Sequence, residues 1–119
     1  IGAPTMNFLE AEASGDRLRI AGREMASPVR GLAPGRVQLG VRPEHLSLAA
    51  EGIPAVVDVI EPLGADTLLH GRFGTERELV TVRQAGHVLA KPGEKRRFNV
   101  DARHLHLFDS QTGKRIAGG

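Results

Sequence analysis

The chain has 119 residues, the length of one ordinary domain, and its 40% hydrophobic and 25% charged residues are typical of a folded globular protein. It contains no cysteine, so disulfides, thiolate metal ligands and cysteine nucleophiles are excluded. Sixteen basic residues are offset by fourteen acids, and a net charge of only +2 gives little long-range attraction for nucleic acid or anionic lipid.

Short segments in which polar and apolar residues alternate predict β-strands, and no long segment has the spacing of an amphipathic helix. The first, Arg17–Ile20, places two arginines on one face and two aliphatic residues on the other. A second, at residues 36–42, directs Val37, Leu39 and Val41 towards the core. Pro43-Glu44-His45 predicts a single helical turn, because proline suits the first helical position.

The middle of the chain predicts a three-stranded meander. Its parts are a strand at Pro54–Glu61, a turn at residues 62–65, a strand at Asp66–Phe73, the Gly74-Thr75 turn and a strand at Arg77–Arg83. Pro62 cannot donate a ladder hydrogen bond and Gly64 has no side chain, so we expect the strand pairing to kink there.

A repeat indicates how these strands are organised. Residues 33–48 and 91–107 both contain a Pro-Gly turn, an alternating strand, a valine and the pattern His-Leu-x-Leu. Each half alone is too short for a stable core, so we expect two similar β-units that share one. The prediction is an all-β barrel or sandwich with little helix, a single domain over 1–119. Its parts are a first unit at 1–50, a second unit at 51–110 with the boundary between them near residues 49–52, and a flexible tail at 111–119.

Catalytic and metal-binding patterns are absent from this reading. His104 and His106 are expected on one face of a strand, a geometry that metals use, but Leu105 and Leu107 need the opposite face for the core. No serine, histidine and acid form a recognisable local frame, and Gly113-Lys114 lacks the earlier glycine of a phosphate-binding P-loop. We therefore predict no catalytic residue, no cofactor site and no metal site.

Nucleic-acid binding is weakly supported. Lys95-Arg96-Arg97 with Arg103 is the best basic cluster, and a solvated strand start explains it more simply. The chain has no tyrosine or tryptophan on which bases stack, and we expect its four phenylalanines to pack in the core: Phe8, Phe73, Phe98 and Phe108.

Four segments together carry a family resemblance: Ile1–Leu9, Gly40–Leu46, Val59–Thr67 and Leu105–Asp109. In this order and spacing they resemble the C-terminal regulatory region of ATP-binding subunits of bacterial ABC importers of the maltose and glycerol-3-phosphate type. The resemblance implies a TOBE domain with the oligonucleotide/oligosaccharide-binding (OB) type of β-barrel, appended to an ATPase domain that holds ATP and magnesium.

The resemblance also implies partners and a location. The partners are its own ATPase domain, a second copy of the subunit, membrane-spanning permease subunits and, in some members, a regulatory protein, but no nucleic acid. The full-length parent would be a cytoplasmic ATPase at the inner face of the cell membrane that imports a sugar or related solute. This piece would regulate it and contact its twin without catalysis. No apolar run of about 18 residues is present, which agrees with a soluble, intracellular chain.

Six residues at two kinked turns are the candidate interface residues: Arg42, Glu44, His45, Glu61, Gly64 and Asp66. The alternative is that proline and glycine merely break the strands there. Two other functions stay open: a sensor domain for a small ligand, either an oxyanion or the transported solute, and a nucleic-acid-binding OB barrel.

Overall fold

The computed structural model describes residues 4–74 and 78–118, of which 63% lie in strands. The described elements are β1 (Asn7–Gly15), β2 (Arg17–Ile20), β3 (Arg23–Ala26), β4 (Leu32–Val41), the 3-10 turn η1 (Pro43–His45), β5 (Leu46–Ala49), β6 (Ile53–Pro62), β7 (Asp66–Phe73), β8 (Glu78–Ala85), β9 (Lys95–Val100), the 3-10 turn η2 (Ala102–His104), β10 (His106–Asp109) and β11 (Arg115–Gly118). The predicted all-β class, with little helix, is confirmed.

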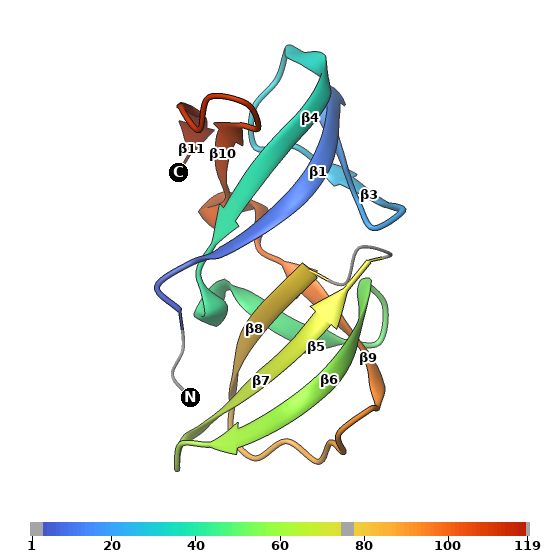
Figure 1. Cartoon of the computed structure of the whole chain (residues 1–119), viewed down its shortest axis with the longest axis vertical. Helices are drawn as coiled ribbons and strands as arrows, with labels where there is room; N and C mark the ends of the chain where they lie inside the picture. Colours follow the sequence, from blue (N-terminus) through green and yellow to red (C-terminus); the bar gives the residue numbers. More distant parts are fainter. Residues whose placement is uncertain (1–3, 75–77, 119) are drawn as a thin grey trace.

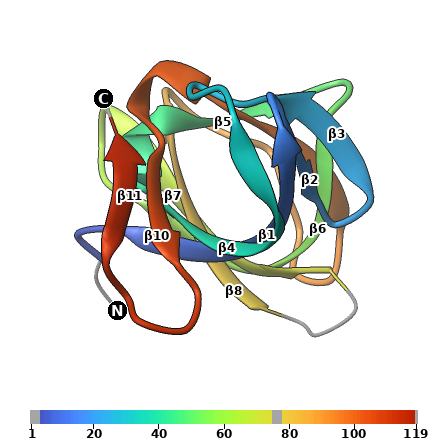
Figure 2. The same cartoon turned by 90° about the horizontal axis from the view of Figure 1, so that it is seen from above.

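The strands form two antiparallel sheets placed end to end along an elongated molecule of 41 × 23 × 22 Å (Figure 1). The first sheet has the order β11-β10-β4-β1-β2-β3, and the second has the order β5-β9-β6-β7-β8. Viewed along the long axis, the strands curve around a common centre (Figure 2). This curvature is the OB-like barrel that the family resemblance implies.

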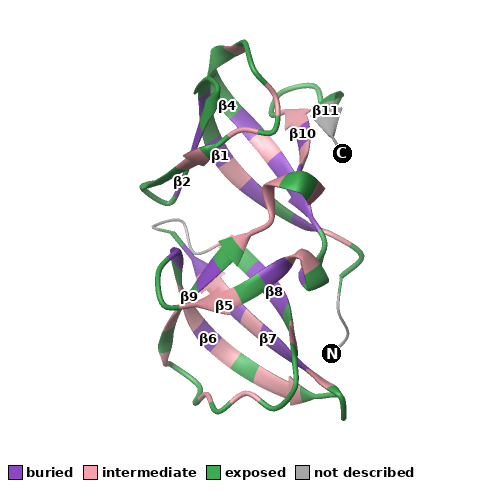
Figure 3. Cartoon of the chain, turned by 180° about the vertical axis from the view of Figure 1, so that it is seen from behind, coloured by how far each residue is buried: buried purple, intermediate pink, exposed green. Residues whose placement is uncertain are grey.

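One hydrophobic core runs through both sheets. Buried and exposed residues alternate most clearly along β1 and β2 (Figure 3), so these strands give one face to the interior. Leu39 of the first sheet and Phe98 of the second belong to the same cluster, at 0% and 2% exposure. The predicted core faces of the strands at 17–20 and 36–42 are confirmed, and the predicted sharing of one core is as well.

The two copies of the repeat carry the chain between the sheets. The first runs from β4 through η1 into β5, and the second runs from β9 through η2 into β10. They cross in opposite directions and pair with each other, β5 with β9 and β10 with β4. We call η1 and η2, residues 43–45 and 102–104, the seam. The predicted turn at Pro43-Glu44-His45 is confirmed.

The grouping of strands differs from the units expected at 1–50 and 51–110. β5 lies in the second sheet, whereas β10 and β11 return to the first. Residues 50–52 join β5 to β6, two strands of one sheet, so the crossing between sheets occurs at the seam instead. Residues 115–118, expected in the tail, form an edge strand that pairs with β10. Alternation shows that a segment is a strand, but it does not identify the partner strand.

The meander β6-β7-β8 is confirmed over its described residues, whereas Thr75 of the predicted turn and Arg77 of the predicted third strand lie outside them. The irregularity of the meander lies elsewhere than expected. Pro62 still pairs with Thr67, and the register shifts between Val57 and Val59. A proline at the end of a ladder leaves the pairing intact, because its missing N–H is needed only where a neighbour would accept it. The extra residue at the bulge is Asp58, whose carboxylate binds the Arg72 guanidinium through two hydrogen bonds of 2.7 and 2.8 Å.

Asn7, which pairs with Val41 just before η1, also joins the two sheets. Its side chain is 5% exposed, and its Nδ2 donates to the carbonyl oxygen of Thr81 at 2.8 Å. Its Oδ1 accepts the N–H of Thr81, also at 2.8 Å. One amide of β1 therefore satisfies both backbone groups of a residue on β8, the edge strand of the second sheet.

Replacing Asn7 by alanine should destabilise the fold. The change leaves the buried N–H and carbonyl of Thr81 without partners, which costs roughly 1–3 kcal/mol for each group. Chemical denaturation of Asn7→Ala measures this loss, and Glu12→Ala on the exposed face of the same strand is the control, expected within about 0.5 kcal/mol of the parent. Equal small losses in both variants would show that the bond pair contributes little.

Candidate protein interface

The seam is held by contacts between equivalent residues of the two repeats. His45 and His104 occupy the same position in each copy, and their rings stack with centroids 3.7 Å apart and planes 10° from parallel. The backbone N–H of Asp101 donates to the carbonyl of His45 at 3.1 Å. The Nδ1 atom of His45 is buried and has no hydrogen-bond partner among the described residues. The repeat thus forms a local approximate twofold arrangement.

The two halves of the seam differ in whether their charged side chains are paired. Asp101 caps η2: it accepts the N–H of Arg103 at 3.1 Å and binds the Arg103 guanidinium at 3.1 and 3.2 Å. These bonds hold the pKa of the Asp101 carboxyl below its ordinary value, and the bonds from the Arg103 guanidinium contribute most. Partial desolvation of the carboxyl acts in the opposite direction. η1 follows Arg42 and has no side-chain cap. Arg42 and Glu44 are exposed and form no ion pair within the described part of the chain.

The β6–β7 turn carries the other three candidate interface residues. Gly64 has φ = 90°, a left-handed conformation that favours glycine, so the chain turns there, within the turn predicted at residues 62–65. Asp66 accepts a 2.7 Å hydrogen bond from Nε of Arg83. Glu61 Oε1 lies 3.0 Å from His70 Nε2. Two of the three are therefore engaged in side-chain contacts on the sheet itself.

The structure brings the six candidates together as two groups of three. η1 lies at the waist of the molecule, whereas the β6–β7 turn lies at the lower tip of the second sheet (Figure 1). One surface therefore cannot include both groups unless it extends along most of the second sheet. Their role as an interface stays a prediction.

The histidine pair expected on one strand face is not formed. His104 lies in η2 against His45, while His106 lies in β10, with its Nδ1 3.2 Å from the Arg115 guanidinium. The predicted burial of Leu105 and Leu107 is confirmed at 0% exposure. Among the described residues, no group of three metal-ligating side chains converges. His104 is the last residue of a 3-10 turn, which strand alternation does not reveal, so the two histidines do not share a strand.

One chain of contacts has the composition of a hydrolytic triad. Thr81 Oγ1 lies 3.1 Å from His70 Nδ1, and the opposite ring nitrogen meets Glu61. Thr81 is only 7% exposed, so its hydroxyl is not available to a substrate, whereas a nucleophile must reach the reacting atom. The contacts tie three strands of the second sheet together and are structural.

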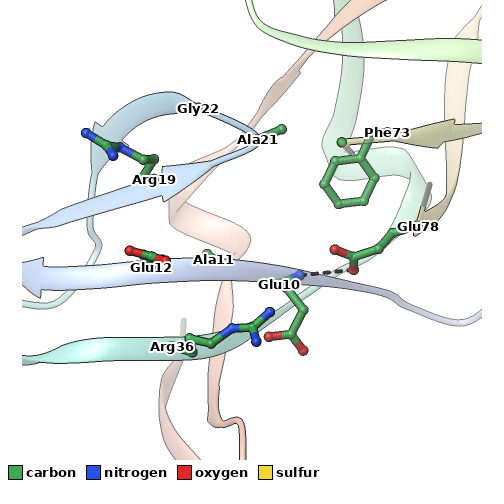
Figure 4. Close-up of a pocket in the computed structure, with 10 residues that line it drawn as sticks. Glu10, Ala11, Glu12, Arg19, Ala21, Gly22, Arg36, Phe73 and Glu78 are labelled. Carbon is green, nitrogen blue, oxygen red and sulfur yellow. Dashed lines mark hydrogen bonds between the residues drawn. The ribbon is translucent and has the colours of Figure 1, made fainter. Parts of the chain in front are cut away.

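A cavity of about 410 Å³ lies between the first sheet and the end of β7 (Figure 4). Three carboxylates line it, Glu10, Glu12 and Glu78, together with the guanidiniums of Arg19 and Arg36. The Glu78 carboxylate accepts the backbone N–H of Glu10 at 3.2 Å, which joins the two sheets here. The excess of carboxylates opposes binding of an oxyanion. Sequence reasoning missed this cavity, because its residues come from five strands, β1, β2, β4, β7 and β8.

Two of the four phenylalanines expected in the core lie outside it. Phe73 and Phe98 are buried, as predicted, but Phe8 is 49% exposed and packs edge-on against Phe108 with ring centroids 6.1 Å apart. Gly40 makes room for this pair, because a Cβ there would lie 2.9 Å from a ring carbon of Phe108. The odd-numbered residues of β1 face the core, so Phe8 faces outward.

Comparison with known proteins identifies the family to which this architecture belongs. Residues 39–108 match the TOBE domain model, and residues 2–46 match the MalK OB fold domain model. The chain belongs to the TOBE domain family. Similar proteins include the sn-glycerol-3-phosphate import ATP-binding protein UgpC of Ruegeria sp. (strain TM1040), 46% identical over 98% of this chain and 33% of the relative. UgpC of Bordetella avium is 39% identical over 99% of this chain and 35% of the relative.

This TOBE domain therefore spans about a third of the length of the relatives it matches, and it corresponds to their C-terminal part. The family resemblance read from four segments of the sequence is confirmed along the whole chain. In the described ranges, no helix has the length and apolar character needed to cross a bilayer.

A valine at position 64 should cost more stability than an alanine at position 44. A Cβ at Gly64 would meet no atom within 4 Å, so the penalty for Gly64→Val is backbone strain of about 1–2 kcal/mol. Glu44→Ala, on an exposed turn, should stay within about 0.5 kcal/mol of the parent. Urea denaturation compares the two, and losses of equal size would contradict the importance of the bend.

The acid stability of the TOBE domain should depend on Asp101. Because its pKa is lowered in the folded state, its stabilising effect is fully present above the unfolded value of about 3.9 and is lost as pH falls through the folded value. The unfolding free energy of Asp101→Asn should therefore fall less steeply between about pH 5 and pH 2 than that of the parent. Parallel curves would show that the Arg103 contacts do not favour the ionised carboxyl.

Proposed function

We propose that this TOBE domain is the accessory, regulatory part of an ABC importer ATP-binding subunit that imports sn-glycerol 3-phosphate or a related solute. The observation that carries the proposal is similarity over 98–99% of the chain to two import ATP-binding proteins of which it covers only about a third. The remaining length of such a subunit would bind ATP and magnesium and hydrolyse the nucleotide.

This piece would take no part in the chemistry itself. Its sequence lacks a P-loop, since Gly113-Lys114 has no glycine five positions earlier. Among the described residues, the contacts of Thr81, His70 and Glu61 resemble a catalytic triad, but Thr81 is buried and cannot reach a substrate. Its contribution would be a stiff surface, fastened by the seam and by Asn7, at a constant distance from the ATPase domain.

The surface that we assign to protein contact is η1. Arg42 and Glu44 are exposed, lie on a turn fixed by the buried Pro43 and Leu46, and have no ion-pair partner within the described residues. Exposed opposite charges on an ordered turn suit recognition of a complementary partner surface, because the backbone that carries them is already fixed and only the side chains are ordered on binding. The partner would be a second copy of the subunit or a regulatory protein, on the cytoplasmic side of the permease.

Charge reversal at η1 in the full-length ATP-binding subunit tests this role. We expect Arg42→Glu to weaken self-association about tenfold, because a like charge then faces the partner. Arg30→Glu, an equally exposed reversal in the β3–β4 loop, is the matched control. Light scattering gives the association constant, and solute uptake by reconstituted transporter reports the functional effect. Unchanged association and uptake in both variants would remove η1 from the interface.

A further inference from the structure

The cavity beside the first sheet holds charges of both signs in two separate groups (Figure 4). At one end the guanidiniums of Arg19 and Arg36 flank the Glu12 carboxylate, and at the other lie the carboxylates of Glu10 and Glu78. We call these groups the cationic end and the acidic end. A ligand with a single ionic group matches only one of them, whereas a molecule that carries both charges is complementary to the whole cavity.

Strand register forms the cationic end. Glu12 on β1 pairs with Arg19 on β2 and with Arg36 on β4, and residues that pair across a sheet point to the same face. Arg19 meets Glu24 at 3.7 Å, but both side chains are more than half exposed, so this ion pair contributes little. In the described ranges, no carboxylate lies within ion-pair distance of Arg36. The two guanidiniums therefore keep charge available for a ligand.

The acidic end lies further along β1. Glu10 is two residues before Glu12, so it faces the same side of the sheet about 7 Å away. Its neighbour on β4 is Gln38, which carries no charge. The Glu10 carboxylate accepts a long hydrogen bond of 3.3 Å from the Ser110 hydroxyl, and no cation of the described residues lies within ion-pair distance. Its negative charge is therefore not neutralised by these neighbours.

Glu78 brings a second carboxylate to the acidic end from the other sheet. Its Oε2 accepts the backbone N–H of Glu10 at 3.2 Å, which holds it beside β1. Phe73 forms an apolar wall of the cavity, and its ring is fixed by edge-on packing against Phe98 with centroids 6.3 Å apart. Two neighbouring carboxylates repel each other, more strongly beside an apolar wall than in open water, and a cation bound between them relieves this repulsion.

We propose that this cavity binds a small zwitterion of the ω-amino acid type, with its ammonium at the acidic end and its carboxylate at the cationic end. An ammonium offers three N–H donors, and a guanidinium matches both oxygens of a carboxylate. The spacing of about 7 Å between the ends suits an ammonium and a carboxylate separated by a few carbon atoms. The volume of about 410 Å³ is that of a small-molecule site. The site is argued from this chain's side chains and does not rest on the proposed transport role.

NMR titration of the isotope-labelled chain tests the proposal with three probes of equal chain length: γ-aminobutyrate, butylamine and butyrate. We expect γ-aminobutyrate to shift the amides of Glu10–Glu12 and Arg36 saturably, and to bind at least tenfold more tightly than either probe that lacks one charge. Lack of saturation by γ-aminobutyrate would overturn the site. Equal binding of butylamine would also overturn it, because a plain amine would then suffice.

Two variants separate the ends of the cavity. Arg36→Gln should weaken γ-aminobutyrate about tenfold and leave butylamine no weaker, whereas Glu10→Gln should weaken both probes. Arg30→Gln and Glu51→Gln are the matched controls, because both residues are exposed and lie outside the cavity. If Glu10→Gln is unstable, Arg36→Gln alone decides the matter, since this side chain is exposed. Equal weakening in the cavity and control variants, or an Arg36→Gln chain that binds γ-aminobutyrate as the parent does, would overturn the proposal.

Discussion

The antiparallel pairing of the two crossings is the constraint on which this fold depends. Each crossing leaves one sheet and starts a strand of the other, so neither sheet is complete without both copies of the repeat. Leu46 and Leu105 follow the two turns and are buried to 1% and 0% exposure, which anchors the core where the sheets meet. His45 and His104, whose rings stack on each other, immediately precede these two leucines in the sequence. The molecule is therefore one folding unit of two sheets and not two domains in series.

This constraint leaves the outer faces of the sheets available for other roles. The seam, Asn7 and the Glu78 contact with β1 all lie where the sheets meet, so substitutions on the far faces need not disturb the connection. The charge distribution divides accordingly. Carboxylates are in excess beside the first sheet, while cations line the outer face of the second. A net charge near zero thus conceals two surfaces of opposite sign.

The fold was predictable wherever branched or long aliphatic residues alternate with polar ones, as in the strands at 17–20 and 36–42. β1 was missed although it also alternates, because Ala11 and Ala13 occupy core positions and alanine is a weak strand former. The hairpin turn after β2 was missed too, since Ala21 takes φ = 49°, a conformation that Ala rarely adopts. Contacts between the sheets were not predictable, because the residues that form them are distant in sequence: Asn7 and Thr81 are 74 positions apart.

The candidate sites show the same division between local and distant causes. Pro43 and Gly64 mark turns through their own backbone preferences, so both turns were correctly located from the sequence. The run at 95–97 is visible in the sequence, but a basic run acquires meaning only from what surrounds it. Arg97 is oriented by a carbonyl 45 positions earlier and flanked by Ala49 and Pro54, which come from two other strands. A freely solvated arginine and one oriented by a distant carbonyl have the same local sequence, and the neighbouring strands decide between them.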